Sequence, residues 1–348
     1  MAHVNLQGNV ADCEGGAVYL KGISEAVLAD VSLTVNKAGL GCEPGGGGLG
    51  GGIAAHEVGR LQMLDATFGR NTAFYSGGGG YFEKVGTLAV DRADFSGNVS
   101  THGAGGAAFV KGDLSGQMTF GNVVIANNAA DVVGGGLALV DLAGADMAMV
   151  RFEDNSALSG GALFAASVGR IALFDAEFER NRAINGSGYG AGGGAILAKD
   201  YGSMAIRRAA FTGNRNTGAA SNGSAMLLCT RPGSEEGRRT LGEASWAMCG
   251  FLFADFGSGP VGASGLTTLE DVTFSGNTPG VVVRGEQLGS FALVRARVMD
   301  NVDPMIIGQF FLDGVLATSV LDSEFVHSAG PDGWAGDFYV RERCGAPG

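Results

Sequence analysis

Four aspartates, each just before a repeated Phe-x-x-Asn motif, are candidates for binding or catalysis. They are Asp65, Asp91, Asp175 and Asp271, in the segments LDATF, VDRADF, FDAEF and EDVTF. If these side chains point outward from successive repeats, they form an acidic row suited to a cation or a glycan. A simpler interpretation, which we favour, is that they are solvated carboxylates that keep strands soluble and discourage edge pairing.

Other patterns for catalysis or metal binding are missing from the sequence. It has no Asp-Asp pair, no Gly-His-Gly, no Asn-Thr-Asp and no Cys-x-x-Cys, and its four histidines are scattered. The glycine-rich segments GCEPGGGGLGGG and GSGYGAGGG lack the Gly-Lys-Ser/Thr ending of phosphate-binding loops. We therefore expect no metal site, no cofactor and no enzymatic activity. The alternative is a carbohydrate-active enzyme, a polysaccharide lyase or hydrolase on a pectate-lyase-like β-helix.

The spacing of the five cysteines favours disulfide bonds. Cys13 and Cys42 are about one repeat apart, while Cys229 and Cys249 flank the polar segment TRPGSEEGRRTLGEASWAM. A bond between the second two would close that segment into a protruding loop. Cys344 is left over. The competing interpretation is five buried or free thiols in a reducing compartment.

Three Asn-x-Ser/Thr sequons begin at Asn98, Asn185 and Asn222. Asn98 belongs to the repeated motif, so we expect it to be unavailable for glycosylation. Asn185 and Asn222 fall in predicted loops and are the glycosylation candidates. Chance produces sequons at a similar frequency, so their presence alone decides nothing.

The Phe-x-x-Asn motif recurs along most of the chain, with many neighbouring copies 24 to 30 residues apart. Its six full copies are Phe68–Asn71, Phe95–Asn98, Phe152–Asn155, Phe178–Asn181, Phe211–Asn214 and Phe274–Asn277. Degenerate copies are Leu6–Asn9, Leu33–Asn36, Ile125–Asn128, Val298–Asn301 and an eroded Phe325–Ser328. A repeat of this length is typical of solenoid proteins.

A second motif, a glycine pair, keeps step with the first. Its copies are Gly15-Gly16-Ala17, Gly51-Gly52-Ile53, Gly79-Gly80, Gly105-Gly106-Ala107, Gly135-Gly136, Gly160-Gly161-Ala162 and Gly193-Gly194-Ala195. Between the motifs, apolar residues alternate with polar ones, which is the period of a strand with one buried face. We predict an all-β chain, a right-handed parallel β-helix of roughly ten to twelve coils over residues 1–328, with 329–348 as a C-terminal cap or tail.

The paired motifs resemble the Gly-Gly-Ala-(Ile/Leu/Val) and Phe-x-x-Asn repeats of the chlamydial polymorphic membrane proteins. The resemblance covers most of residues 5–301 and implies the passenger domain of a surface adhesin. Similar repeats occur in large extracellular proteins of other organisms. The chain departs from that family in lacking a C-terminal outer-membrane barrel, and its glycine pair fades after Gly194.

Composition and charge limit the classes of partner. The net charge is −12, and 63 of the 348 residues are glycine. With no basic stripe we expect no nucleic-acid partner, and with no long apolar run we expect no membrane insertion. No signal peptide is visible, and the repeat starts by Leu6 without a preceding cap, so we expect the chain to be part of a longer protein or an assembly. The predicted location is extracellular or at the cell surface.

Insertions in the repeat are the predicted recognition elements. They lie near residues 37–50, 182–192 and 230–244, and the first two follow the closing asparagine at the same point of the repeat. The partner-binding candidates in them are Tyr189, Arg231, Arg238 and Arg239, residue types that often anchor interfaces. We predict a structural or adhesion protein whose partner is a protein or glycan at a surface, or copies of itself.

Overall fold

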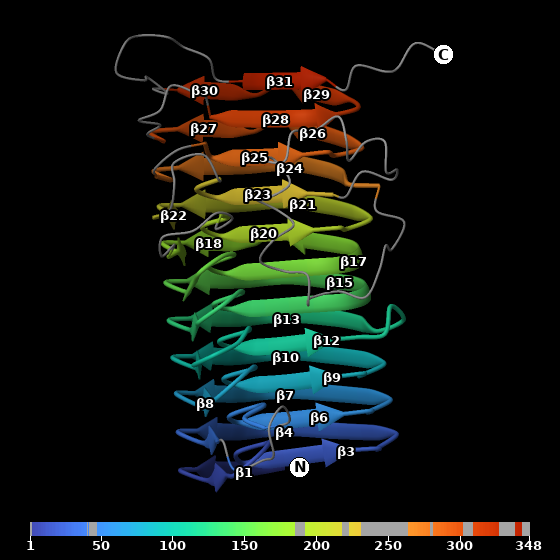
Figure 1. The fold of residues 1–348 in the computed structure, drawn as a ribbon, viewed down its shortest axis with the longest axis vertical. Coiled ribbons are helices and arrows are strands. Elements are labelled where there is room, and N and C mark those ends of the chain that lie inside the picture. Colours follow the sequence, from blue (N-terminus) through green and yellow to red (C-terminus); the bar gives the residue numbers. More distant parts are fainter. Residues whose placement is uncertain are drawn as a thin grey trace.

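The computed structural model describes residues 2–39, 41, 47–184, 192–217, 223–230, 264–278, 281–301, 309–326 and 338–342. Their regular structure consists of β-strands, and all strand pairings are parallel. Figure 1 shows the strands stacked in one column, from β1 beside the N-terminus to β31 near the C-terminus. This arrangement confirms the predicted parallel β-helix.

Each coil contributes up to three strands: a short one, a long one and a two-residue one. The short strands are β3 (Val18–Lys21), β6 (Ile53–His56), β9 (Gly80–Glu83), β12 (Ala108–Lys111), β20 (Ile196–Lys199), β23 (Met226–Cys229), β25 (Val283–Glu286), β28 (Phe310–Val315) and β31 (Phe338–Glu342). The two-residue strands form a separate sheet and are β2 (Val10–Ala11), β5 (Lys37–Ala38), β8 (Thr72–Ala73), β11 (Val99–Ser100), β14 (Ala129–Ala130), β16 (Ser156–Ala157), β19 (Arg182–Ala183) and β22 (Arg215–Asn216).

The long strands carry the residues that matter most below. They are β1 (Ala2–Gln7), β4 (Glu25–Thr34), β7 (Arg60–Gly69), β10 (Thr87–Ser96), β13 (Gln117–Ala126), β21 (Ser203–Thr212) and β24 (Leu266–Ser275). In β15 (Leu137–Glu153) the short and long strands are continuous. In other coils the long strand is divided, as in β17 (Leu163–Phe174) with β18 (Glu177–Glu179), β26 (Ser290–Val294) with β27 (Arg297–Met299), and β29 (Thr318–Leu321) with β30 (Glu324–Val326).

The first residues of the closing motifs form one interior column. In order they are Leu6, Leu33, Phe68, Phe95, Ile125, Phe152, Phe178, Phe211, Phe274, Val298 and Phe325, eleven levels within the predicted range. The five phenylalanines predicted to be interior are confirmed, because each is at most 1% exposed. The rings of Phe178 and Phe211 stack with centroids 4.7 Å apart. Where Ile125 interrupts the stack, the ring of Phe120 takes its place, with its centroid 6.4 Å from that of Phe95.

The closing asparagines form a hydrogen-bonded ladder along the rod, running from Asn9 to Asn301. At a typical level, Nδ2 of Asn155 donates to Oδ1 of Asn181 (3.0 Å) and to the backbone oxygen of Ile125 (2.8 Å). Its own Oδ1 accepts bonds from the backbone nitrogen and Nδ2 of Asn128. Each amide thereby satisfies its polar atoms inside the rod.

The glycine motif turns the chain into the short strand. The first glycine has a positive φ (69° at Gly105), and a Cβ on the second, Gly106, would lie 2.2 Å from the oxygen of Gly135 in the next coil. The positive φ favours glycine, and the close contact at Gly106 leaves no room for a Cβ. In three repeats the glycine pair predicted from the sequence is displaced from the turn by one or two residues, because the positive-φ glycines there are Gly50, Gly77 and Gly134.

The long strands bend at one residue that has a positive φ. The bend residues are mostly charged or polar and are Asp30, Asp65, Arg92, Asn122, Met149, Asp175, Arg208, Asp271, Arg295 and Asp322. Aspartate and asparagine tolerate this left-handed region better than most residues. The bends stack into a corner of the rod, so charged side chains of successive coils meet there.

Candidate functional site

Outward-facing side chains of the long strands line up in columns along the rod. Alternate residues face outward, because those between them, such as Phe120 and Met147, are buried in the interior. The parallel register places two outward columns side by side over β7, β10, β13, β15 and β17. The first column is Gln62, Ala89, Thr119, Asp146 and Ala172, and the second is Leu64, Asp91, Gly121, Ala148 and Phe174.

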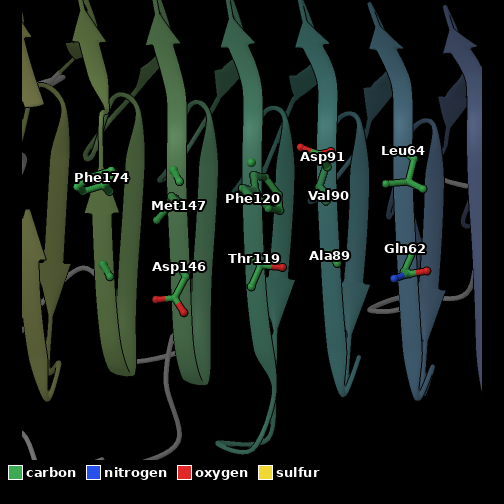
Figure 2. Close-up of a pocket in the computed structure, with 13 residues that line it drawn as sticks. Gln62, Leu64, Ala89, Val90, Asp91, Thr119, Phe120, Asp146, Met147 and Phe174 are labelled. Carbon is green, nitrogen blue, oxygen red and sulfur yellow. The ribbon is translucent and has the colours of Figure 1, made fainter. Parts of the chain in front are cut away.

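A shallow hollow interrupts the second column, and we call it the strand-face depression. Its lining runs from Gln62 and Leu64 of β7 to Phe174 of β17, and between Asp91 and Phe174 the column holds only Gly121 and Ala148 (Figure 2). Because these two residues have little or no side chain, they leave a volume of about 380 Å³. Thr119 of the first column lies on its rim.

An aromatic ring closes one end of the depression. Phe174 is 38% exposed, and Cζ of Arg208, from the next coil, lies 3.5 Å from the centre of its ring. Arg208 is held in turn by Asp175, with Nη2 2.7 Å from Oδ2. The guanidinium covers one face of the ring, and the ring lines one end of the depression.

Carboxylates, each paired with an arginine, flank the depression. Asp91 is bonded by Arg92, and its Oδ1 also accepts a hydrogen bond from Nδ2 of Asn122 (3.1 Å). Asp146 is bonded by Arg170 through Oδ2, whereas its buried Oδ1 has no hydrogen-bond partner among the described residues. The surface therefore offers oxygen acceptors and N–H donors together, with little net charge.

The acidic row, the less favoured of the two interpretations of the four aspartates, does not form, for two reasons. The register pairs Asp91 with Leu64 and Gly121, so this aspartate lies one position before the bend that Asp65, Asp175 and Asp271 occupy. The bend position also carries both signs of charge, so aspartates there meet arginines. Arg92 bonds Asp65 (2.7 Å), and equivalent pairs are Arg208 with Asp175 and Arg295 with Asp271.

These arginines lower the pKa of Asp65, Asp175 and Asp271, chiefly by donating hydrogen bonds to the carboxylates. A carboxyl group with a lowered pKa is ionised at neutral pH and has no proton to give to a leaving group. The row therefore does not provide a general acid of the kind that glycoside hydrolysis requires.

A second polar cluster, at the short strands near the N-terminal end, was missed in the sequence. His56 lies between two glutamates, with Nε2 2.9 Å from Glu14 and Nδ1 3.2 Å from Glu83. Its ring also lies 5.4 Å from that of Tyr81, whose pKa is raised by burial and by the glutamates. His56 and the two glutamates come from three consecutive coils, so only the coil register could have signalled this cluster.

Two cysteines of the predicted pairs lie in the described part of the chain. Cys13 and Cys229 are both disulfide-bonded. Their expected partners, Cys42 and Cys249, lie outside the described residues, so the pairing stays a prediction. Cys344 also lies outside them.

The predicted glycosylation and partner-binding residues also lie outside the described residues. They are Asn185, Asn222, Tyr189, Arg231, Arg238 and Arg239. Asn98, as expected, is fully buried in the asparagine ladder. Of the three insertions, those near 37–50 and 182–192 are preceded by β5 and β19 of the two-residue sheet. The third is preceded by the short strand β23, at a different edge of the coil.

The described part of the chain lacks two further features. It contains no cluster of three or more His, Cys, Asp or Glu side chains placed to hold a metal ion. Nor does it contain a helix long and apolar enough to cross a membrane. Compared with known proteins, the chain matches no protein-family profile, no curated protein and no solved structure.

Proposed function

We propose that the protein is an extracellular or cell-surface β-helical rod with a structural or adhesive role. The observation that supports this proposal best is the pairing of the exposed aspartates with arginines along the long strands. Asp65, Asp175 and Asp271 are each held by an arginine of the next coil. Such pairs link neighbouring coils at the surface, as expected of a load-bearing scaffold.

The interior supports the same proposal. The ladder of buried amides continues from coil to coil at a spacing of about 4.8 Å, and stacked phenylalanine rings accompany it over part of its length, so the interior forms a long, regular rod. Disulfides and N-glycans, if present as predicted, would suit a protein that works outside the cell. We place recognition in the three insertions, because they alone interrupt the repeat.

The competing proposal is a polysaccharide lyase or hydrolase on the same scaffold. A hydrolase needs two carboxyl groups about 5–9.5 Å apart, one of them protonated. The arginine pairs oppose that requirement. We therefore expect purified protein to release no reducing ends or unsaturated products from polygalacturonate, β-glucan or chitin, and measurable turnover would favour the enzyme.

Location and recognition are tested separately. Surface biotinylation of intact source cells should label the protein, and labelling only after lysis would contradict the proposed location. Protein-coated beads should adhere to host-cell or sister-cell monolayers. Deleting residues 42–46, 185–191 and 231–244 together, with an unchanged circular dichroism spectrum, should abolish adhesion if the insertions recognise the partner.

A further inference from the structure

We propose that the strand-face depression is a binding site for a neutral sugar unit of a glycan. The inference rests on the proposed surface function, and it adds a ligand class and a second recognition surface on the strands themselves. It is argued from the shape of the hollow, from the aromatic ring at its end and from the chemistry of the polar groups around it.

The shape suits a small ring. The hollow has a volume of about 380 Å³, within the usual range for small-molecule sites of about 300–1,000 Å³. Its lining extends from β7 to β17, four coil spacings or about 19 Å. Its floor is formed by Gly121 and Ala148, so a flat ligand can approach the sheet closely.

The aromatic end suits the apolar face of a sugar. One face of a pyranose ring carries mainly C–H groups, which pack well on an aromatic face. Phe174 lines one end of the depression, and Arg208, which stacks on one face of its ring and is bonded to Asp175, fixes its orientation. An aromatic side chain held in this way loses little conformational entropy on binding.

The polar groups suit hydroxyls better than charged groups. A hydroxyl both donates and accepts hydrogen bonds. The lining offers the carboxylates of Asp91 and Asp146 as acceptors and the side chains of Gln62 and Thr119 as both donors and acceptors. An anionic ligand would meet two carboxylates, and a cationic one would compete with arginines already in place. Asp146 Oδ1, which has no bond among the described residues, would gain one by turning toward a ligand hydroxyl.

The inference is tested by saturation-transfer NMR with the full chain. The probes are neutral disaccharides of glucose, mannose, galactose and N-acetylglucosamine, with digalacturonate as the anionic comparator. We expect at least one neutral disaccharide to bind and digalacturonate not to. Ala148→Leu, which fills the hollow, and Phe174→Ala should each raise its Kd at least tenfold.

The matched control is Ala29→Leu. Ala29 lies in the same outward column, next to Leu64 but outside the depression, so a leucine there should leave the Kd unchanged. Melting temperatures within a few degrees of the wild type establish that the variants are folded. The proposal is overturned if no neutral disaccharide binds, if digalacturonate binds better, or if both depression variants bind like the control.

The outcomes also separate this inference from the proposed function. If beads adhere to cells but no neutral disaccharide binds, the surface function stands and the sugar site is lost. If the protein is not at the cell surface yet binds a disaccharide in the depression, the site stands and the proposed function is lost.

Discussion

At the scale of single residues, the asparagine ladder provides the most specific contacts between neighbouring coils. Asn155 has no exposed surface, and its side-chain amide makes four hydrogen bonds, two donated and two accepted. Removing it leaves partners on both neighbouring coils without a bond in a place that water does not reach. Unsatisfied buried groups cost about 1–3 kcal/mol each.

We therefore predict that Asn155→Ala lowers the free energy of unfolding by roughly 3–5 kcal/mol, since more than one partner is left unsatisfied. Chemical denaturation followed by far-UV circular dichroism measures the loss. Gln117→Ala, on the exposed face of β13, is the control and should change stability by less than about 0.5 kcal/mol. A loss from Asn155→Ala no larger than that of the control would show that the ladder is dispensable.

The interior phenylalanines give a second prediction at this scale. Phe178 is buried and stacks on Phe152 and Phe211, so Phe178→Ala should cost about 3–5 kcal/mol by leaving a cavity. Phe174→Ala removes the same atoms from the outer face, where the ring is partly in water. The same denaturation experiment should give it the smaller loss, and equal losses would contradict the assignment of inner and outer faces.

At the scale of the coil, the bends and turns show where local preference and the fold disagree. Val35 follows β4 with a φ of 58°, a region that β-branched residues rarely occupy. Equivalent positions in other coils hold Arg70, Asn127 and Asp154, also with positive φ. The side chain of Val35 is 44% exposed, so packing does not compensate for the strain.

Val35→Asn is predicted to stabilise the protein by about 1 kcal/mol, because it relieves a left-handed conformation worth about 1–2 kcal/mol. The measurement is a rise in the urea midpoint at an unchanged m-value. Val124→Asn is the control, since Val124 is similarly exposed but lies within β13. There the substitution should be neutral or destabilising, and stabilisation by both would point to solubility rather than backbone strain.

Much of the fold could be predicted because one coil of sequence contains its own register. Phe178 and Asn181 fix which residues face inward and where the strand ends, and the same pair recurs at each level. The glycine turns were less certain, because runs such as Gly134 to Gly136 allow the motif to slide, and only the φ angles decide.

The candidate site could not be predicted in the same way. Asp65 meets Arg92 because both occupy the bend of consecutive coils, a relation that depends on counting exact coil lengths. The strand-face depression depends on two small residues, Gly121 and Ala148, lying between larger ones in a column that exists only after folding. The cluster around His56 likewise joins residues of three coils.

At the scale of the whole molecule, the surface ion pairs should set the response to acid. The folded-state pKa values of Asp65 and Asp271 are lowered by their arginines below the unfolded value near 3.9. A group of this kind adds stability above its unfolded pKa and loses it as the pH falls through the lower, folded pKa. The contribution is fully present at neutral pH and disappears below about pH 4.

The double variant Arg92→Gln/Arg295→Gln should therefore unfold at a higher pH than the wild type in an acid titration followed by circular dichroism. The shift should be small, because the pairs are exposed, and it should shrink in high salt. Arg60→Gln, at an exposed arginine for which the described residues show no ion pair, is the control. An acid midpoint that does not move, or that moves equally in the control, would show that these ion pairs do not set the stability at low pH.

The state of the cysteines tests whether the whole molecule matures in an oxidising compartment. If Cys13 pairs with Cys42 and Cys229 with Cys249, protein unfolded without reductant should show one reactive thiol, that of Cys344, and five after reduction. The second bond would enclose about 20 residues, a loop for which a disulfide adds roughly 3 kcal/mol, so reduction should also lower the melting temperature. Mass spectrometry of unreduced peptides identifies the partners. Five reactive thiols before reduction would contradict the bonds at Cys13 and Cys229 and would favour a reducing compartment, against the proposed surface location.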